Sequence, residues 1–210
     1  MLYSDALPEI DHKISSLTSR ASALQTPADR LPATLPEMNH FFQGGLRWGE
    51  LSEWGSPWGG GCREVLLLFL AAAHRQTSTQ PYWCLWVHDH TDVSVYPPAW
   101  QARGINLKYI RFAVTKKPLQ DLKAAFTSSF FKLIILDCTT AIHHDDCCFL
   151  AQQARRHRNI TIVIRNYFLS PHKGNVWAKT RVNCWHDPLQ GNFYLKSVKG
   201  LAPKQLSFRI

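Results

Sequence analysis

The residues that most suggest chemistry are the glycines between Gly55 and Gly61, together with Cys62 and Arg63 directly after them. They follow a short segment, 50–54, that we predict to be a strand. They precede an apolar run, 65–73, that we predict to be a buried helix. A strand, a glycine-rich turn and a helix are the layout of a phosphate-binding loop, in which backbone N–H groups and the helix N-terminus face the anion.

The match to the template G-x-x-x-x-G-K-[ST] is incomplete. Gly55 and Gly60 occupy the glycine positions, but Gly61 stands at the lysine and Cys62 at the hydroxyl residue. That lysine contacts the terminal phosphates and that hydroxyl ligates magnesium. Arg63 is a candidate substitute cation, but its place two residues after Gly61 predicts a side chain that points elsewhere on the helix. The pattern therefore predicts the shape of the loop without its chemistry, and a plain tight turn is the alternative.

Strands and helices alternate along most of the chain. We expect strands at 82–87, 107–114, 132–137 and 160–164, and helices at 99–103, 119–128 and 145–157. Such alternation predicts an α/β fold, with a mainly parallel central sheet and helices on both faces. From 176 on the pattern changes to short strands at 176–185, 192–198 and 205–210, which predicts an antiparallel edge.

The N-terminal residues form a separate predicted region. An amphipathic helix over 10–23 would place Ile10, Ile14 and Leu17 on one side, and prolines interrupt the chain that follows. We predict an arm and connector over 1–34 and a core domain over 35–210. The apolar side of the arm is either a partner-binding surface or a face packed on its own domain.

Composition narrows the class of protein. Lys and Arg number 24 against 15 Asp and Glu, and the net charge of +9 favours acidic partners such as nucleic acid. The six cysteines form no C-x-x-C pair, which suggests reduced thiols in the cytoplasm. The N-terminus lacks a signal-peptide pattern, and the run 65–73 is far below the ~20 residues that span a bilayer. We therefore expect a cytoplasmic protein that binds no membrane.

Several segments resemble the RecA core in order and spacing: the lead-in GGLRWGELSEWGSPWGGG, then YWCLWVHDH, LIILDC and LKSVKGLAPKQLSF. The resemblance spans about 35–210 and implies a RecA-like P-loop core. It places His90 at the catalytic glutamate, Asp137 at the Walker B aspartate and Asn166 at the γ-phosphate-sensing glutamine. The implied degenerate nucleotide site comprises Gly55, Gly60, Gly61, Cys62, Arg63, His90, Asp137 and Asn166.

A RecA-like core of this size with an eroded loop is similar to the ImuA family, also described as SulA-like, whose members accompany translesion polymerases in bacterial mutagenesis cassettes. The resemblance implies a non-catalytic accessory protein of SOS-response translesion DNA synthesis that needs no cofactor. Its implied partners are a Y-family-like polymerase of the ImuB type and an error-prone DnaE-type polymerase, with RecA and single-stranded DNA as further candidates. The alternatives are a SulA-like inhibitor of the tubulin-like division protein, and an ATPase with an unorthodox P-loop.

Cations and aromatic residues alternate between Arg165 and Arg181. The candidate DNA-binding residues there are Arg165, His172, Lys173, Trp177, Lys179 and Arg181. Stacking rings beside cations suit single-stranded DNA, and this segment corresponds to a DNA-contacting loop of the RecA core. A solvated basic loop is the alternative.

A cluster of possible metal ligands occupies 143–148, with two histidines, two aspartates and two cysteines in succession. We predict no metal site there, because adjacent ligands on a helix point about 100° apart and no second cluster supplies the remaining ligands. Asp145 and Asp146 are instead predicted to cap a helix.

Overall fold

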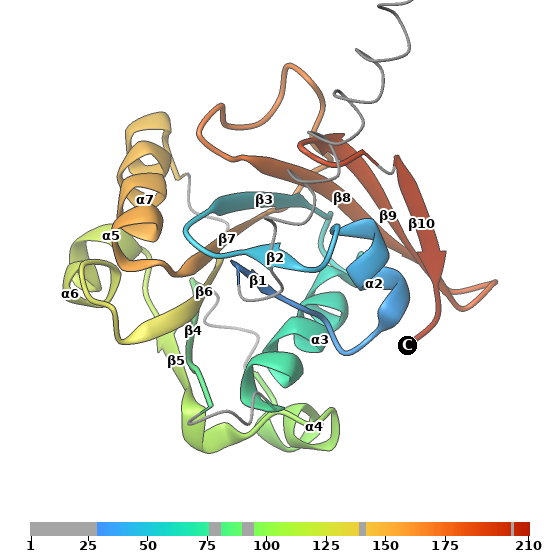
Figure 1. Cartoon of the computed structure of the whole chain (residues 1–210), viewed down its shortest axis with the longest axis horizontal. Coiled ribbons are helices and arrows are strands. Elements are labelled where there is room, and N and C mark those ends of the chain that lie inside the picture. Colours follow the sequence, from blue (N-terminus) through green and yellow to red (C-terminus); the bar gives the residue numbers. More distant parts are fainter. Residues whose placement is uncertain (1–28, 76–80, 90–94, 139–141, 203) are drawn as a thin grey trace, which may run out of the picture. The chain divides into compact units, whose positions relative to one another are not determined.

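The structure, a computed structural model, describes residues 29–75, 81–89, 95–138, 142–202 and 204–210 (Figure 1). The chain divides into two units, 1–30 and 31–210. The predicted arm helix with Ile10, Ile14 and Leu17 lies outside the described residues, and so does His90.

One eight-stranded sheet organises this unit (Figure 1). Its strands are β3 (Leu51–Gly55), β4 (Trp83–His88), β5 (Ile110–Val114), β6 (Phe131–Asp137), β7 (Ile160–Arg165), β8 (Thr180–Asp187), β9 (Asn192–Lys199) and β10 (Gln205–Phe208). Their order is β10-β9-β8-β3-β7-β6-β4-β5. The pairs from β8 to β5 are parallel, and those of β9 with β8 and β10 are antiparallel. This confirms the predicted parallel sheet with an antiparallel C-terminal edge.

Helices cover both faces of the sheet, as predicted (Figure 1). The helices are α2 (Pro36–Phe41), α3 (Cys62–Arg75), α4 (Pro97–Ala102), α5 (Pro118–Asp121), α6 (Lys123–Phe126) and α7 (His144–His157). Helix α3 packs against β8, whereas α7 packs against β3 and β7. Two very short strands, β1 (Arg30–Leu31) and β2 (Leu46–Arg47), pair separately.

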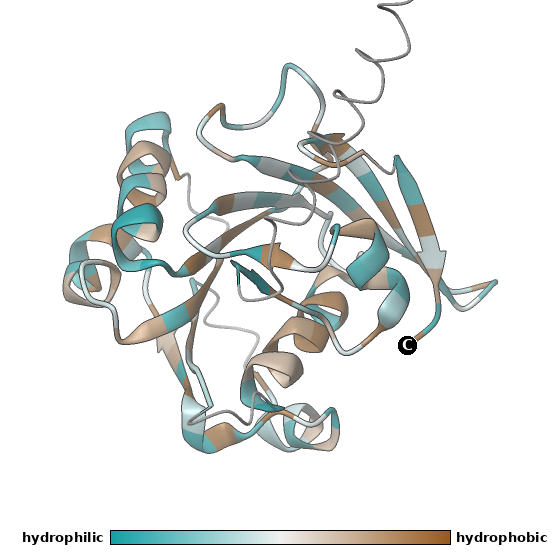
Figure 2. Cartoon of the chain, viewed as in Figure 1, coloured by the Kyte–Doolittle hydropathy of each residue, from teal (hydrophilic) through white to brown (hydrophobic). Residues whose placement is uncertain are grey.

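The central strands are buried on both sides. In β6, Leu133 and Ile135 join the apolar cluster that contains α3, whereas Ile134 and Leu136 join the cluster that contains α7. Alternate side chains of a strand point to opposite faces, so a sheet sandwiched between helices needs continuous apolar strands. The hydropathy colouring shows such strands at the centre of the sheet (Figure 2).

Three predicted elements differ in the structure. The helix expected over 119–128 is two short helices, α5 and α6, because Leu122 leaves the helical conformation (φ −113°, ψ 23°). The strand expected from Leu107 begins at Ile110, after a 3-10 turn in which the Asn106 side chain accepts from the Lys108 N–H. The extended segment expected from 176 becomes β8 only at Thr180.

Helix α7 begins as predicted. The Asp146 carboxylate accepts a hydrogen bond from the His143 N–H (2.8 Å), and an N-terminal carboxylate also complements the positive end of the helix. The capping role of this cluster is therefore confirmed for Asp146.

The parallel strands deliver their last residues to one edge. Gly55, His88, Asp137 and Arg165 end β3, β4, β6 and β7 respectively, and in sheets of this kind ligand sites form at the carboxyl edge. In the part of the chain that the structure describes, no helix is both long and apolar enough to cross a membrane.

Candidate functional site

Two backbone N–H groups of the turn between β3 and α3 already donate hydrogen bonds to acceptors within the protein. The Gly60 N–H donates to the Pro57 carbonyl (2.8 Å), and the Trp58 N–H donates to the Asn166 side-chain oxygen (2.8 Å). A phosphate-binding loop keeps such groups free for the oxygens of its ligand. Asn166, expected at the γ-phosphate-sensing position, here holds the turn in place.

Gly61, at the position of the missing lysine, is tightly enclosed. Its φ is +80°, and a Cβ built there would lie 2.8 Å from the Phe193 ring and 3.0 Å from the His186 Cβ. A positive φ strains residues with a side chain. Strands β8 and β9 therefore leave no room for a lysine at this point.

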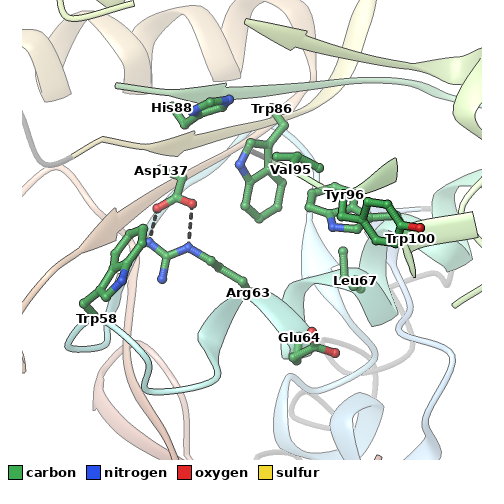
Figure 3. Close-up of a pocket in the computed structure, with 10 residues that line it drawn as sticks. All are labelled: Trp58, Arg63, Glu64, Leu67, Trp86, His88, Val95, Tyr96, Trp100 and Asp137. Carbon is green, nitrogen blue, oxygen red and sulfur yellow. Dashed lines mark hydrogen bonds and ion pairs between the residues drawn. The ribbon is translucent and has the colours of Figure 1, made fainter. Parts of the chain in front are cut away.

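Arg63 and Asp137 form a bidentate ion pair at the carboxyl edge (Figure 3). Arg63 Nε lies 2.6 Å from one Asp137 oxygen and a terminal guanidinium nitrogen lies 2.5 Å from the other. Asp137 is buried, and the Trp58 ring covers the guanidinium, with 4.0 Å from Cζ to the ring centroid. The expectation that Arg63 points elsewhere on the helix is thus wrong: its long side chain reaches back to the end of β6.

This pair occupies the groups that nucleotide chemistry would need. In P-loop proteins the Walker B aspartate holds the magnesium ion, but both Asp137 oxygens here accept from Arg63. Bidentate arginine–carboxylate contacts are among the stronger charge-assisted hydrogen bonds. Binding magnesium at Asp137 would first require separating this pair.

Cys62 replaces the magnesium-binding hydroxyl at the start of α3. Its side chain is fully buried, and burial together with the neighbouring Cys184 thiol raises the pKa of Cys62 well above its usual value. A thiol that stays protonated is a poor ligand, because metals bind the thiolate. Cys62 therefore acts as a small apolar residue.

A pocket of about 200 Å³ opens beside the ion pair (Figure 3). Its lining residues are Trp58, Arg63, Glu64, Leu67, Trp86, His88, Val95, Tyr96, Trp100 and Asp137. Trp86 is fully buried and stands edge-on to Trp100 (4.8 Å between centroids), whereas 69% of Tyr96 is exposed. Aromatic walls around a few charged groups can hold a flat or apolar group of modest size.

Sequence reasoning missed Glu53, which is fully buried in β3 and pairs with Arg165. Arg165 Nε lies 2.8 Å from Glu53 Oε1. Burial by itself lowers the pKa of Arg165, but the Glu53 charge and hydrogen bond outweigh it and the net shift is upward. The sequence did carry a signal for this buried pair: Glu53 is a carboxylate in the middle of a strand that is too apolar to face water. Arg165 is therefore a structural partner of Glu53, and its contact with DNA stays a prediction.

Buried polar groups also fix the loop 166–179. The Asn183 side chain accepts from the Leu169 N–H (2.7 Å) and donates to the Leu169 carbonyl (2.9 Å). Arg181, with 8% of its surface exposed, donates to the Ser170 and Pro171 carbonyls. Arg181 thus fixes the loop to β8, and its contact with DNA, like that of Arg165, stays a prediction.

The other candidates of this segment are at the surface. His172, Lys173 and Lys179 are exposed, and the Lys173 ammonium lies 3.9 Å from the Tyr167 ring centroid. Trp177 is 40% exposed, and its Nε1–H donates to His144 Nε2 (3.0 Å). These four side chains are placed where a ligand could reach them.

Together, the parallel sheet, the turn before α3 and the aspartate ending β6 define a RecA-like fold. The crystal structure of the RadB recombinase is similar, with a TM-score of 0.64 and 17% sequence identity over 83% of this chain and 93% of that chain. At this identity the likeness concerns the fold. No model of a protein family matches the chain, and no curated protein sequence does so either.

Proposed function

We propose that this chain is a non-catalytic RecA-like accessory protein of translesion DNA synthesis. The observation that carries the non-catalytic part is the Arg63–Asp137 ion pair, since it engages the carboxylate that would bind magnesium. The enclosed Gly61 and the buried thiol of Cys62 support the same conclusion. At the template positions of the lysine and the hydroxyl residue the chain has Gly61 and Cys62, so neither of these groups is available for phosphate or magnesium there.

The class of partner follows from the sequence resemblance to the ImuA and SulA-like proteins, not from the fold. The proposed partners are a Y-family-like polymerase of the ImuB type and an error-prone DnaE-type polymerase, with RecA and single-stranded DNA as additional ones. The pocket beside Arg63 has the composition of a protein-binding hot spot, because Trp, Tyr and Arg dominate such spots. Its lining includes Trp58, Tyr96 and Trp100.

RecA-type subunits associate head to tail, and such association propagates unless one face is changed. A subunit whose nucleotide face is altered but whose arm remains would bind a partner without extending a polymer. We therefore expect the arm, which lies within 1–34, to contribute to binding of a polymerase or RecA, in a cytoplasmic complex.

Purified protein and a variant lacking residues 1–30 should be compared in pull-downs with the two polymerases, RecA and the tubulin-like division protein. We expect the full chain to retain a polymerase and the truncated chain to retain less of it. Retention of the division protein alone would overturn the proposal in favour of the inhibitor. Calorimetry with ATP and magnesium should show no micromolar binding, and turnover that Asp137→Ala abolishes would contradict the non-catalytic assignment.

A further inference from the structure

At the antiparallel edge, β8 and β9 carry aromatic side chains on the face of the sheet opposite to α3. In β8, Val182 and Cys184 point inward and join the core with α3. Trp185 directly follows the inward-facing Cys184 and therefore points to the opposite face. Its side chain and that of Tyr194 on β9 are only partly buried.

These rings form an ordered row across the strands. Trp185 and Tyr194 are register partners, and their rings are stacked with centroids 5.2 Å apart and planes 8° apart. Phe168, 47% exposed, stands edge-on to Trp185 at 6.1 Å. On the other side, the register partner of Tyr194 is Ser207 on β10, an exposed residue with a small side chain. The face of the Tyr194 ring that Trp185 does not cover is therefore bordered by a short side chain.

Cations flank this row on the same face. Lys196, the next outward residue of β9, is exposed and pairs in register with Asn183 and Gln205. Arg209 follows β10 on the other side of the row, where it donates to the Asn192 side chain (2.9 Å). Farther along β9, burial and the neighbouring Arg181 and Lys179 charges lower the pKa of Lys199. Positive charge is therefore concentrated at this edge of the sheet.

We propose that the row Phe168, Trp185 and Tyr194 is a binding platform for single-stranded nucleic acid, with bases on the open Tyr194 ring and phosphates near Lys196 and Arg209. Aromatic rings on an open sheet face, bordered by cations, bind single strands through base stacking and backbone charge, with little dependence on sequence. The platform shares Phe168 with the loop 166–179 that carries His172, Lys173 and Lys179, but Trp185, Tyr194 and Lys196 come from β8 and β9, so it extends beyond the loop candidates. It deepens the nucleic-acid part of the proposed function and does not depend on the polymerase part.

Fluorescence anisotropy with a short labelled oligo(dT), and in parallel with oligo(U), tests the platform on the full chain. We expect Tyr194→Ala to weaken binding roughly 5- to 150-fold, since one base–aromatic stack is worth about 1–3 kcal/mol. Tyr194→Phe keeps the ring and loses only the hydroxyl that donates to Gln190, so it should bind like the original chain. If Tyr194→Ala loses binding to either oligonucleotide, the result supports the proposal. The oligonucleotide that is affected shows whether the platform accepts deoxyribose or ribose.

Lys196→Ala should lower the slope of log affinity against log salt by about 0.7, the value for one lost single-strand phosphate contact. Phe130→Ala and Lys123→Ala are matched controls, because both residues are exposed and come from other elements. The proposal is overturned if neither oligonucleotide binds at low salt, or if Tyr194→Ala binds as tightly as Phe130→Ala. Polymerase pull-down with Tyr194→Ala separates this outcome from a failure of the proposed function, since that association should be unchanged.

Discussion

The Glu53 carboxylate lies 2.7 Å from a terminal nitrogen of the Arg165 guanidinium, and none of the Glu53 side chain is exposed while 12% of the Arg165 side chain is. The second Glu53 oxygen accepts from the Asn175 N–H (2.5 Å). One buried carboxylate therefore joins two neighbouring strands and the loop that follows them. The Glu53 carboxylate fixes the C-terminal part of the loop 166–179 to the sheet. The Asn183 side chain does the same near the start of this loop.

We expect Glu53→Ala to lower the free energy of unfolding by about 3–5 kcal/mol, because it leaves the Arg165 charge buried without its partner. Replacing both residues by methionine should cost less than Glu53→Ala alone, since no unpaired charge then remains. Urea unfolding followed by circular dichroism measures both. Arg103→Ala is the control: it breaks the Arg103–Glu64 pair (3.0 Å), whose side chains are about half exposed, and should cost less than about 1 kcal/mol. A Glu53→Ala loss as small as this would contradict the structural role.

Restoring the template with Gly61→Lys and Cys62→Ser should not create an ATP site. The lysine Cβ would press on the Phe193 ring, the positive φ disfavours any side chain, and Asp137 would still be paired with Arg63. We expect no calorimetric signal with ATP and magnesium, and a stability loss of at least ~1 kcal/mol. Cys62→Ser alone is the matched control for the helix start. Micromolar ATP binding by the double variant would show that the loop, and not the ion pair, limits nucleotide binding.

Thiol modification of the folded protein should be confined to Cys148. It is half-buried, whereas the other five cysteines are buried. Burial raises the pKa of Cys138 to about 12 and that of Cys147 to about 11, and only the thiolate reacts. With Ellman's reagent near neutral pH we expect one fast equivalent, which Cys148→Ser removes. Fast reaction of a second thiol in that variant would indicate that the core opens readily.

Stability should fall in mild acid partly through His74. Its Nδ1 accepts from the Asn106 N–H (3.0 Å), and burial lowers the pKa of His74 although a backbone hydrogen bond opposes the shift. The unfolded chain then binds this proton more readily than the folded one. The His74 contribution is complete above a pH of about 6.5, the ordinary histidine pKa, and is lost as the pH falls toward the lower folded value.

His74→Gln removes the titrating group and keeps a polar side chain at this position. Urea midpoints should drop less between neutral pH and the mildly acidic range in this variant than in the original chain. His172→Gln, at an exposed histidine, is the control and should leave the pH dependence unchanged. An identical drop in all three proteins would contradict a buried neutral His74.

Apolar periodicity predicted the central strands well because burial on both faces leaves a strong pattern. The strand expected at 132–137 is β6, Phe131–Asp137, and the one expected at 160–164 is β7, Ile160–Arg165. The break at Leu122 was missed, since helix α5 and helix α6 carry no glycine or internal proline between them. Local propensity does not report such a change of direction.

The glycine positions of the site were predictable, but its contacts were not. Gly61 and Asp137 could be placed by template, whereas the reach of Arg63 to Asp137 joins residues far apart in the sequence. The same holds for Arg165, which reaches the buried Glu53, and for Arg181, which donates to backbone carbonyls of the loop 166–179. From sequence alone, a basic residue near a strand end is expected to be exposed, because only the fold shows which acceptor it reaches.

The order of strands in the sheet has a consequence for biosynthesis. β3 is buried along its whole length, and its two neighbours are β7 and β8, so that Leu51 pairs with Thr161 and Ser52 with Thr180. During translation the ribosome releases β3 long before either neighbour. Until residues 160–187 have emerged, an apolar strand has both hydrogen-bonding edges open, a state that invites chaperone binding or aggregation. Among the strands of this sheet, β3 thus waits through the longest stretch of synthesised chain before its pairing is complete.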